Sequence, residues 1–176
     1  MTSIIGLDTN LIFWMQEHLV TEVLSPWMVG VSAAGNLGMV WILAGFALLC
    51  TKKYRRTGAT VLIGLLFSLL VGNMLLKPLV MRLRPCIEYS WMPLLIDAPK
   101  VNDFSFPSGH TFSSFAAAAA LWCGGKRQWG IMAMLLAAAI GFSRLYLFMH
   151  YPSDVLAGAV LGLAFGRLAW YVSGKM

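Results

Sequence analysis

The sequence predicts an all-α membrane protein: a polytopic transmembrane helical bundle of about five transmembrane helices, preceded by an N-terminal interfacial helix. Composition is the first reason. Of the 176 residues, 59% are hydrophobic and 11% are charged, and the mean hydropathy is +0.75, whereas about 25% of residues are charged in soluble domains. The second reason is a series of apolar runs near the length of about 20 residues that crosses a bilayer. The chain length suits a single domain over residues 1–176.

Five stretches are apolar enough to be the expected spans, approximately 26–50, 58–77, 108–124, 129–147 and 153–172. Polar residues interrupt 8–24, which predicts a helix lying on the membrane surface, with a sixth span as the alternative. The third stretch contains five consecutive alanines at 116–120. Glycines recur every four residues in the last stretch, at Gly158, Gly162 and Gly166, and predict close packing against another helix.

Charged residues divide between the two ends of the expected bundle. Basic residues follow the first, third and fifth spans: Lys52, Lys53, Arg55, Arg56, Lys126, Arg127 and Lys175. All acidic residues fall near the other end: Asp8, Glu17, Glu22, Glu88, Asp97, Asp103 and Asp154. Because cytoplasmic loops are enriched in Lys and Arg, we expect the N-terminus and the long connection 78–107 outside, and the C-terminus inside.

Two other kinds of partner are disfavoured. The net charge is +6, but the cations lie between apolar runs and form no basic stripe with interleaved aromatics, so nucleic acid is not an expected partner. The three cysteines, Cys50, Cys86 and Cys123, lack the spacing of a zinc site. The expected partners are membrane lipids and an anionic substrate.

Three of the cations on the side where this topology predicts few lie close to the ends of expected spans. Lys77 ends the second span, Arg84 follows it, and Arg144 lies near the end of the fourth. Ionisable residues at a membrane boundary are costly unless they face a site or reach the interface, so each alone could simply contact headgroups. Together they predict an anion site, and phosphate suits it because arginine binds its oxygens bidentately while lysine acts as a point charge.

The tetrapeptide Pro107-Ser108-Gly109-His110 predicts the start of the third span. Ser108 is a plausible N-cap, and Gly109 allows a ligand to approach the backbone. A helix N-terminus presents free N–H groups and the positive end of a dipole to an anion. A simple helix cap would explain the tetrapeptide equally well when it is taken alone.

His150 and Asp154 flank Pro152 at the expected start of the last span. A carboxylate four residues away can accept a hydrogen bond from one ring nitrogen of His150, which leaves the other nitrogen free to attack. An interfacial histidine beside a capping Asp is the alternative. Two histidines, three cations and a carboxylate on one face of the membrane favour a catalytic site.

In chain order, Lys-x6-Arg-Pro, Pro-Ser-Gly-His and Ser-Arg-x5-His-x3-Asp resemble the three-part signature of the type 2 phosphatidic acid phosphatase superfamily. The resemblance covers about residues 77–154. Every signature position is matched: Lys77, Arg84, Pro85, Pro107, Ser108, Gly109, His110, Ser143, Arg144, His150 and Asp154.

The resemblance implies a lipid phosphatase or diphosphatase that needs no metal and no other cofactor. His150 would attack phosphorus and form a phosphohistidine, and Asp154 would orient it. His110 would protonate the leaving oxygen and then activate water. The phosphoryl oxygens would be held by Lys77, Arg84, Ser108, Gly109 and Arg144.

Other functions in the same superfamily are weaker expectations. Soluble vanadate-dependent haloperoxidases share the anion pocket, but five apolar spans argue against that class. An inactive lipid-binding or transport protein is disfavoured by the intact signature.

Small members of the superfamily resemble undecaprenyl diphosphate phosphatases, so the expected substrate is that lipid at the outer face of a bacterial inner membrane. The alternatives are phosphatidylglycerophosphate, phosphatidic acid and lipid A.

Overall fold

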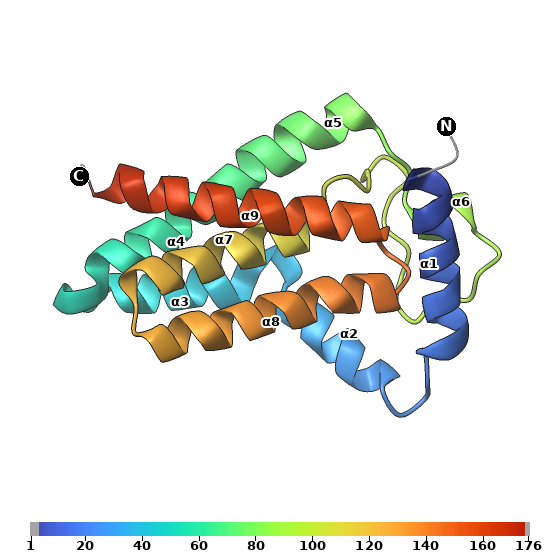
Figure 1. Cartoon of the computed structure of the whole chain (residues 1–176), viewed down its shortest axis with the longest axis horizontal. Coiled ribbons are helices and arrows are strands. Elements are labelled where there is room, and N and C mark those ends of the chain that lie inside the picture. The colour runs from blue at the N-terminus through green and yellow to red at the C-terminus, as the bar shows by residue number, and fades with distance from the viewer. Residues whose placement is uncertain (1–3, 175–176) are drawn as a thin grey trace.

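The computed structural model describes residues 4–174, and every regular element in that range is helical. The elements are α1 (Ile4–His18), α2 (Ser25–Ala34), η1 (Asn36–Gly38), α3 (Met39–Leu49), η2 (Lys52–Tyr54), α4 (Arg55–Phe67), η3 (Ser68–Leu76), α5 (Lys77–Val80), α6 (Pro85–Glu88), α7 (Gly109–Gly124), α8 (Arg127–Tyr146) and α9 (Pro152–Ser173). Helices α3, α4, α7, α8 and α9 run along the long axis of the molecule (Figure 1). The expected all-α membrane class is confirmed. Lys175, expected at the basic end, lies outside the described residues.

Within residues 4–174, three helical segments are long and apolar enough to cross a membrane: Lys52–Glu88, Arg127–Tyr146 and Pro152–Ser173. The bent pair Ser25–Ala34 and Asn36–Leu49 would make a fourth. The remaining expected span corresponds to α7, which has 16 residues and is shorter than the usual span of about 20. It packs against α4, α8 and α9, and its alanine run 116–120 is buried. Small side chains there let three neighbours approach the central helix closely.

The first expected span is broken, which the hydropathy pattern did not predict. Its two helical parts are bent by 44°, and the break contains left-handed backbone at Leu37 (φ 54°) and Gly38 (φ 67°). Glycine adopts this conformation readily, whereas leucine rarely does. The break places Asn36 beside the first turn of α7, where it contacts His110.

The expected close packing of the last helix is confirmed at its glycines. A Cβ atom at Gly162 would lie 2.6 Å from the Cβ of Phe115, and one at Gly166 would lie 2.5 Å from the carbonyl oxygen of Ala116. Both contacts are with α7, so α7 and α9 pack with their backbones close together. The N–H of Ser108 donates to the carbonyl of Asp154 at 3.1 Å, which fixes the start of α7 against the first turn of α9.

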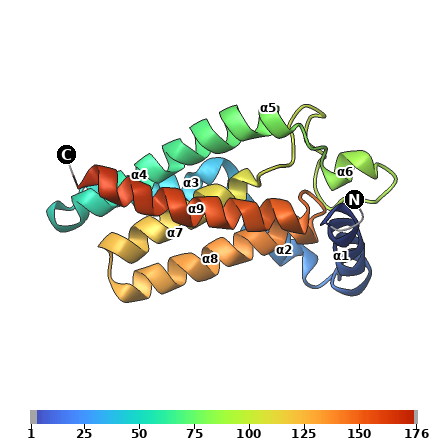
Figure 2. The same cartoon turned by 45° about the horizontal axis from the view of Figure 1, so that its top comes forward.

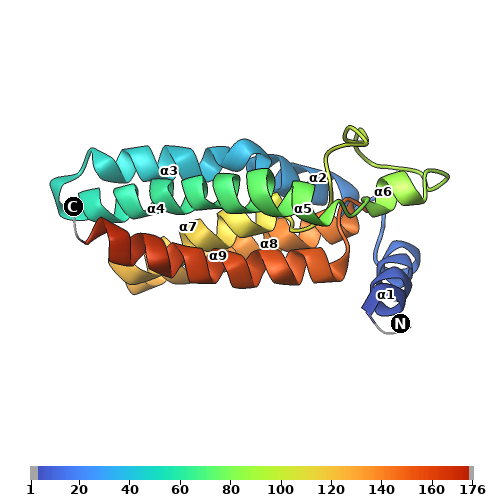
Figure 3. The same cartoon turned by 90° about the horizontal axis from the view of Figure 1, so that it is seen from above.

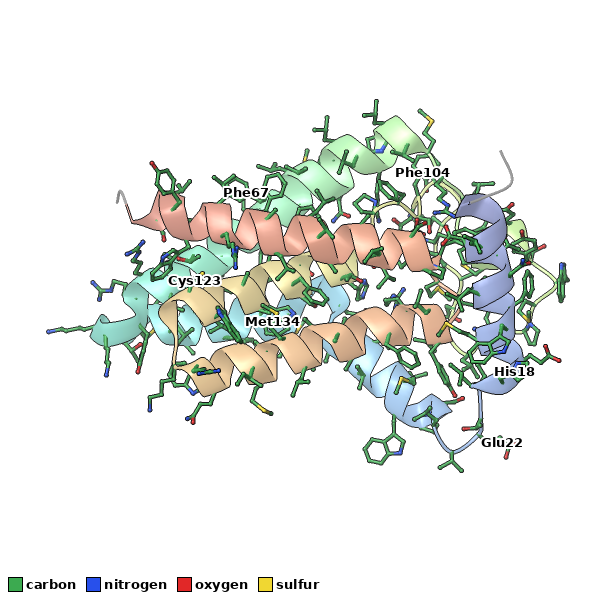
Figure 4. The ribbon with its side chains drawn as sticks, viewed as in Figure 1. His18, Glu22, Phe67, Phe104, Cys123 and Met134 are labelled. Carbon is green, nitrogen blue, oxygen red and sulfur yellow. The ribbon has the colours of Figure 1, made fainter. Side chains whose placement is uncertain are left out.

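The two ends of the bundle differ in charge, as the sequence predicts. The α3–α4 and α7–α8 connections lie at the same end as the C-terminus, while α1, α6 and the 89–108 connection lie at the other (Figures 1 and 2). Thr57 in the first turn of α4 donates to the carbonyl of Gly124 at the end of α7 at 2.8 Å, so the two helix ends next to the basic connections are held together. In Figure 4, Glu22 lies at the end that carries α1, far from Cys123.

Helix α1 lies across the end of the bundle instead of along it (Figures 1 and 3). It has 15 residues and is not among the candidate spans. Ile12 is buried against the bundle, while Leu7, Leu11 and Trp14 are exposed. An apolar exposed face on a helix in this orientation is consistent with the expected interfacial helix.

Candidate active site

One cavity of about 990 Å³ brings together residues from all three sequence motifs. His110 and His150 line it, together with Lys77, Arg84 and Gly109. The other three expected site residues, Ser108, Arg144 and Asp154, are buried. The volume lies at the upper end of the range of about 300–1,000 Å³ that is usual for ligand sites.

His150 lies in the turn between α8 and α9 and is almost fully buried. The turn passes through left-handed backbone at Phe148 (φ 59°), and the N–H of Met149 donates to the carbonyl of Arg144 at 3.0 Å. Burial first, and then the positive charges of Arg84 and Arg144, lower the pKa of His150 well below its ordinary value of 6.5. The ring is therefore neutral near pH 7, which is the nucleophilic form of imidazole.

A serine hydroxyl lies between His150 and Asp154, contrary to the direct hydrogen bond that the sequence suggested. His150 Nδ1 and Asp154 Oδ2 are 3.7 Å apart, which is too long for a hydrogen bond. Ser105 Oγ donates to Asp154 Oδ2 at 2.5 Å and lies 3.2 Å from His150 Nδ1. Because Ser105 has a single hydroxyl proton, it accepts from Nδ1–H, which leaves the lone pair of the ring on Nε2.

Asp154 is held from two further directions. Its Oδ2 accepts from the N–H of Tyr151 at 2.9 Å, and its Oδ1 accepts from Arg82 Nη1 at 2.8 Å. The other guanidinium nitrogen of Arg82, Nη2, donates to Asp8 of α1 at 2.7 Å. Asp8 also accepts from the backbone N–H and the hydroxyl of Ser153. This network links the N-terminal helix to the carboxylate expected to orient His150.

Two of the expected phosphate ligands share one carboxylate. Asp103 accepts from Lys77 Nζ at 2.6 Å and from Arg84 Nη2 at 2.9 Å. Arg84 also donates through Nε to the backbone carbonyl of Asp103 at 2.7 Å, and its Nη1 lies 3.0 Å from His150 Nε2. A cation therefore lies directly beside Nε2, the unprotonated ring nitrogen of the histidine that the family resemblance implies is the nucleophile.

Arg144 is the third expected phosphate ligand, and it has an unused donor. Its Nη1 donates to Ser32 at 2.5 Å, while its Nε is buried without a hydrogen-bond partner. A buried unsatisfied donor costs about 1–3 kcal/mol, and native structures rarely retain one without a reason. An anion in the cavity is a suitable acceptor for this N–H group.

The first turn of α7 differs from the expectation at Ser108. Ser108 occupies the N-cap position, but its hydroxyl makes no capping bond and instead accepts from Thr111 Oγ1 at 2.9 Å. Gly109 does line the cavity, and a Cβ atom there would lie 3.0 Å from Asn73 Oδ1. His110 Nε2 donates to Asn36 Oδ1 at 2.9 Å, so the broken first span orients this histidine.

The sequence interpretation did not single out four residues that contact the expected catalytic groups: Asn36, Arg82, Asp103 and Ser105. Arg82 lies inside the x6 segment of the first motif and Ser105 lies two residues before Pro107. For Arg82 and Ser105, a position inside or beside a motif was the feature that could have identified them. Asn36 lies in a stretch interpreted as one continuous apolar span, so no motif pointed to it.

The same cavity has an extended apolar wall. Its residues come from α3 and from the continuous α4–η3 segment: Ile42, Phe46, Leu62, Leu65, Leu66 and Leu69. Phe104, labelled in Figure 4, lines the cavity near the C-terminal end of α5. The cavity thus combines a cationic site containing two histidines with an apolar surface suited to a hydrocarbon chain.

Comparison with known proteins identifies the family. The model of the PAP2 superfamily matches residues 57–176. A relative named undecaprenyl-diphosphatase, from Sulfolobus acidocaldarius, is 32% identical over 158 residues, which are 90% of this chain and 74% of the relative. A lipid A 4′-phosphatase from Bacteroides thetaiotaomicron is 35% identical over 108 residues, 59% of this chain and 48% of the relative, so the match spans about half of that protein.

Solved structures share the fold. The crystal structure of the first transmembrane PAP2-type phosphatidylglycerolphosphate phosphatase from Bacillus subtilis has a TM-score of 0.79 and 25% identity, covering 100% of this chain and 89% of that one. The structure of Aquifex aeolicus LpxE has a TM-score of 0.81 and 24% identity, covering 94% and 95%. With the family model matched over most of the chain and a relative aligned along nearly all of it, this protein belongs to the PAP2 superfamily of membrane phosphatases.

Proposed function

We propose that this phosphatase hydrolyses a lipid phosphate or diphosphate through a phosphohistidine formed on His150. The observation that carries the proposal is the single cavity in which both histidines and two cations share space with an apolar wall. A soluble phosphate ester would not use that wall. A lipid phosphate would use both parts of the cavity at once.

In the first step, the lone pair of His150 Nε2 attacks phosphorus and the bond from phosphorus to the leaving oxygen breaks. Lys77, Arg84 and Arg144 bind the three equatorial oxygens, whose charge phosphoryl transfer requires the protein to stabilise. His110 gives its proton to the leaving oxygen. The Nδ1–H of His150 remains hydrogen-bonded to Ser105, so the positive charge on the phosphorylated ring faces the Asp154 carboxylate through that hydroxyl.

In the second step, His110 accepts a proton from water as the water oxygen attacks phosphorus. The P–N bond breaks, its electron pair returns to Nε2, and inorganic phosphate is left among the three cations. His110 is then protonated for the next turnover. Both steps place the same charge on the same oxygens, so one set of cations serves both.

For the substrate, we favour undecaprenyl diphosphate, presented from the outer leaflet of a bacterial inner membrane. The relative aligned over 90% of this chain is named undecaprenyl-diphosphatase. Lys100 and Asn102, which precede Asp103 in the chain, also line the cavity, and Lys100 is exposed. A diphosphate places a second anionic group next to the scissile one, where a further cation can bind it.

Phosphatidylglycerophosphate is the second candidate, because the Bacillus subtilis structure that shares the fold is named for that activity. Phosphatidic acid and lipid A remain further candidates. The Lys100→Gln variant separates a diphosphate from a monophosphate: if Lys100 binds the second phosphate, KM rises for undecaprenyl diphosphate and not for phosphatidic acid. Equal effects on both substrates would exclude that role for Lys100.

The proposal is tested with the purified full-length protein in detergent. Phosphate release is compared for undecaprenyl diphosphate, phosphatidylglycerophosphate, phosphatidic acid and lipid A, with and without EDTA. We expect EDTA to leave activity unchanged, and we expect His150→Ala to abolish both turnover and an acid-labile phosphoprotein. Release of phosphate from none of the four lipids, or substantial turnover by His150→Ala with normal thermal unfolding, would contradict the proposal.

A further inference from the structure

The Asp103 carboxylate lies between Lys77 and Arg84, the two cations to which the proposed mechanism assigns phosphoryl oxygens. Its two oxygens accept from the two cations separately, Oδ1 from Lys77 Nζ at 2.6 Å and Oδ2 from Arg84 Nη2 at 2.9 Å. The Asp103 side chain is 45% exposed, whereas those of Lys77 and Arg84 are 13% and 5% exposed. The carboxylate therefore covers the cations from the solvent side.

Asp103 carries its negative charge in this position. Partial burial alone would raise the pKa of the carboxyl, but the hydrogen bond from Lys77 and the charge of Arg84 outweigh burial and lower the pKa below its ordinary value of 3.8. An ionised carboxylate and a phosphoryl group are both acceptor-only anions with similar hydrogen-bond requirements. They cannot occupy the same donors of Lys77 and Arg84 simultaneously.

The backbone around Asp103 is anchored independently of its side chain. Arg84 Nε donates to the carbonyl oxygen of Asp103 at 2.7 Å, and the N–H of Asp103 donates to the carbonyl of Lys100 at 2.9 Å. A change of side-chain rotamer can therefore withdraw the carboxylate without moving the 89–108 connection. Such rotations are fast for partly exposed side chains.

We propose that Asp103 is an internal competitor of phosphate, which occupies the cation site between turnovers and returns to it as inorganic phosphate leaves. This inference rests on the proposed function, because it assigns Lys77 and Arg84 to the phosphoryl group. A ligand must displace the carboxylate before it can bind both cations. A lipid gains binding energy along the apolar wall and can do so at low concentration, while free phosphate has only its charge.

An internal competitor has a quantitative signature. Because displacing Asp103 weakens every phosphate ligand by the same factor, neutralising it strengthens all of them in parallel. The isosteric Asp103→Asn variant is expected to lower the inhibition constant of inorganic phosphate and the KM of phosphatidic acid by similar factors, on the order of tenfold for loss of charge-assisted contacts. Asp97→Asn is the matched control, because Asp97 is an exposed carboxylate on the same connection.

The measurement is inhibition of phosphatidic acid hydrolysis by inorganic phosphate, repeated with Asp103→Ser, which removes the charge from a smaller side chain. An unchanged or higher inhibition constant in both variants would show that Asp103 only positions the two cations, and would overturn the inference. Calorimetric titration with inorganic phosphate reads the same affinity without turnover. It still tests Asp103 if the wild-type protein hydrolyses none of the lipids, so the two proposals fail separately.

Discussion

Replacing Ser105 with alanine tests whether Asp154 acts on His150 through a hydroxyl. In the wild-type structure, Ser105 Oγ lies 2.5 Å from Asp154 Oδ2 and 3.2 Å from His150 Nδ1. Without it, the nearest carboxylate oxygen is 3.7 Å from Nδ1, beyond hydrogen-bonding distance. In the proposed mechanism, the positively charged imidazole ring formed during phosphoryl transfer then loses its hydrogen-bond acceptor.

The size of the effect follows from the hydrogen bond that is lost. A hydrogen bond to a charged group contributes about 1.5–3 kcal/mol, and each 1.4 kcal/mol corresponds to about a factor of ten in rate. We therefore expect kcat for phosphatidic acid to fall by about ten- to a hundredfold in Ser105→Ala. KM should change little, since the Ser105 hydroxyl hydrogen-bonds to His150 and Asp154 and not to the phosphate-binding cations Lys77 and Arg84.

The assay is steady-state phosphate release together with trapping of the phosphoprotein. Ser173→Ala is the matched control, because Ser173 is also a buried serine, hydrogen-bonded to Thr60 at 2.7 Å near the opposite end of α9. If Ser105→Ala keeps kcat within twofold of wild type, the side chain is not a necessary link. A large fall in the Ser173→Ala variant as well would instead indicate a general loss of packing.

Three further predictions follow from the structure. Asn36→Ala should lower kcat by about tenfold, because His110 loses the acceptor that orients it, and steady-state kinetics with Asn36→Asp as the conservative variant measures this. The pKa of His150 is lowered on folding, so the unfolded state binds more protons than the folded state below about pH 6.5. The free energy of unfolding therefore falls as the pH drops through that region. Between pH 7.5 and 5.0, the free energy of urea unfolding should fall less in His150→Gln than in wild type. For topology, an impermeant maleimide added to intact cells should label Val101→Cys and spare Cys50, which is exposed at the opposite end, and the reverse pattern would place the active site in the cytoplasm.

The sequence was sufficient to predict the positions of residues that lie at the starts and ends of helices. Lys77 begins α5, His110 lies in the first turn of α7, and His150 precedes α9, so each could be placed at the outer end of a span. Gly162 could likewise be read as a packing position from the four-residue spacing alone. These inferences needed no knowledge of the path of the chain between helices.

The remaining features depend on contacts between distant segments. Hydropathy could not detect the break at Leu37, because the stretch 26–50 is apolar on both sides of it. The positions of Asp103 and Ser105 depend on an irregular connection that is held by Arg84 and by the hydrogen bond from Ser105 N–H to the Arg82 carbonyl at 2.8 Å. No periodic pattern predicts the path of such a segment.

The end of α5 explains how Arg82 and Arg84, two residues apart in the chain, reach different partners. Met81 has left-handed backbone (φ 50°) and closes the helix with a hydrogen bond from its N–H to the Lys77 carbonyl. The chain then leaves the helix, and Arg82 and Arg84 reach opposite ends of the line from His150 through Ser105 to Asp154. A helical continuation would have separated their side chains by about 200°.

Each arginine therefore has a separate electrostatic task. Arg84 lies beside His150, the proposed nucleophile, where its charge helps to keep the ring neutral and, in the proposed mechanism, binds a phosphoryl oxygen. Arg82 balances the buried carboxylate of Asp154, which would otherwise be an uncompensated charge costing several kcal/mol. Since Arg82 also pairs with Asp8, the surface-lying α1 contributes to the same balance, although it lies outside the matched family region. Removal of the Asp8 carboxylate should therefore disturb the orientation of His150, and so kcat, more than it disturbs phosphate binding.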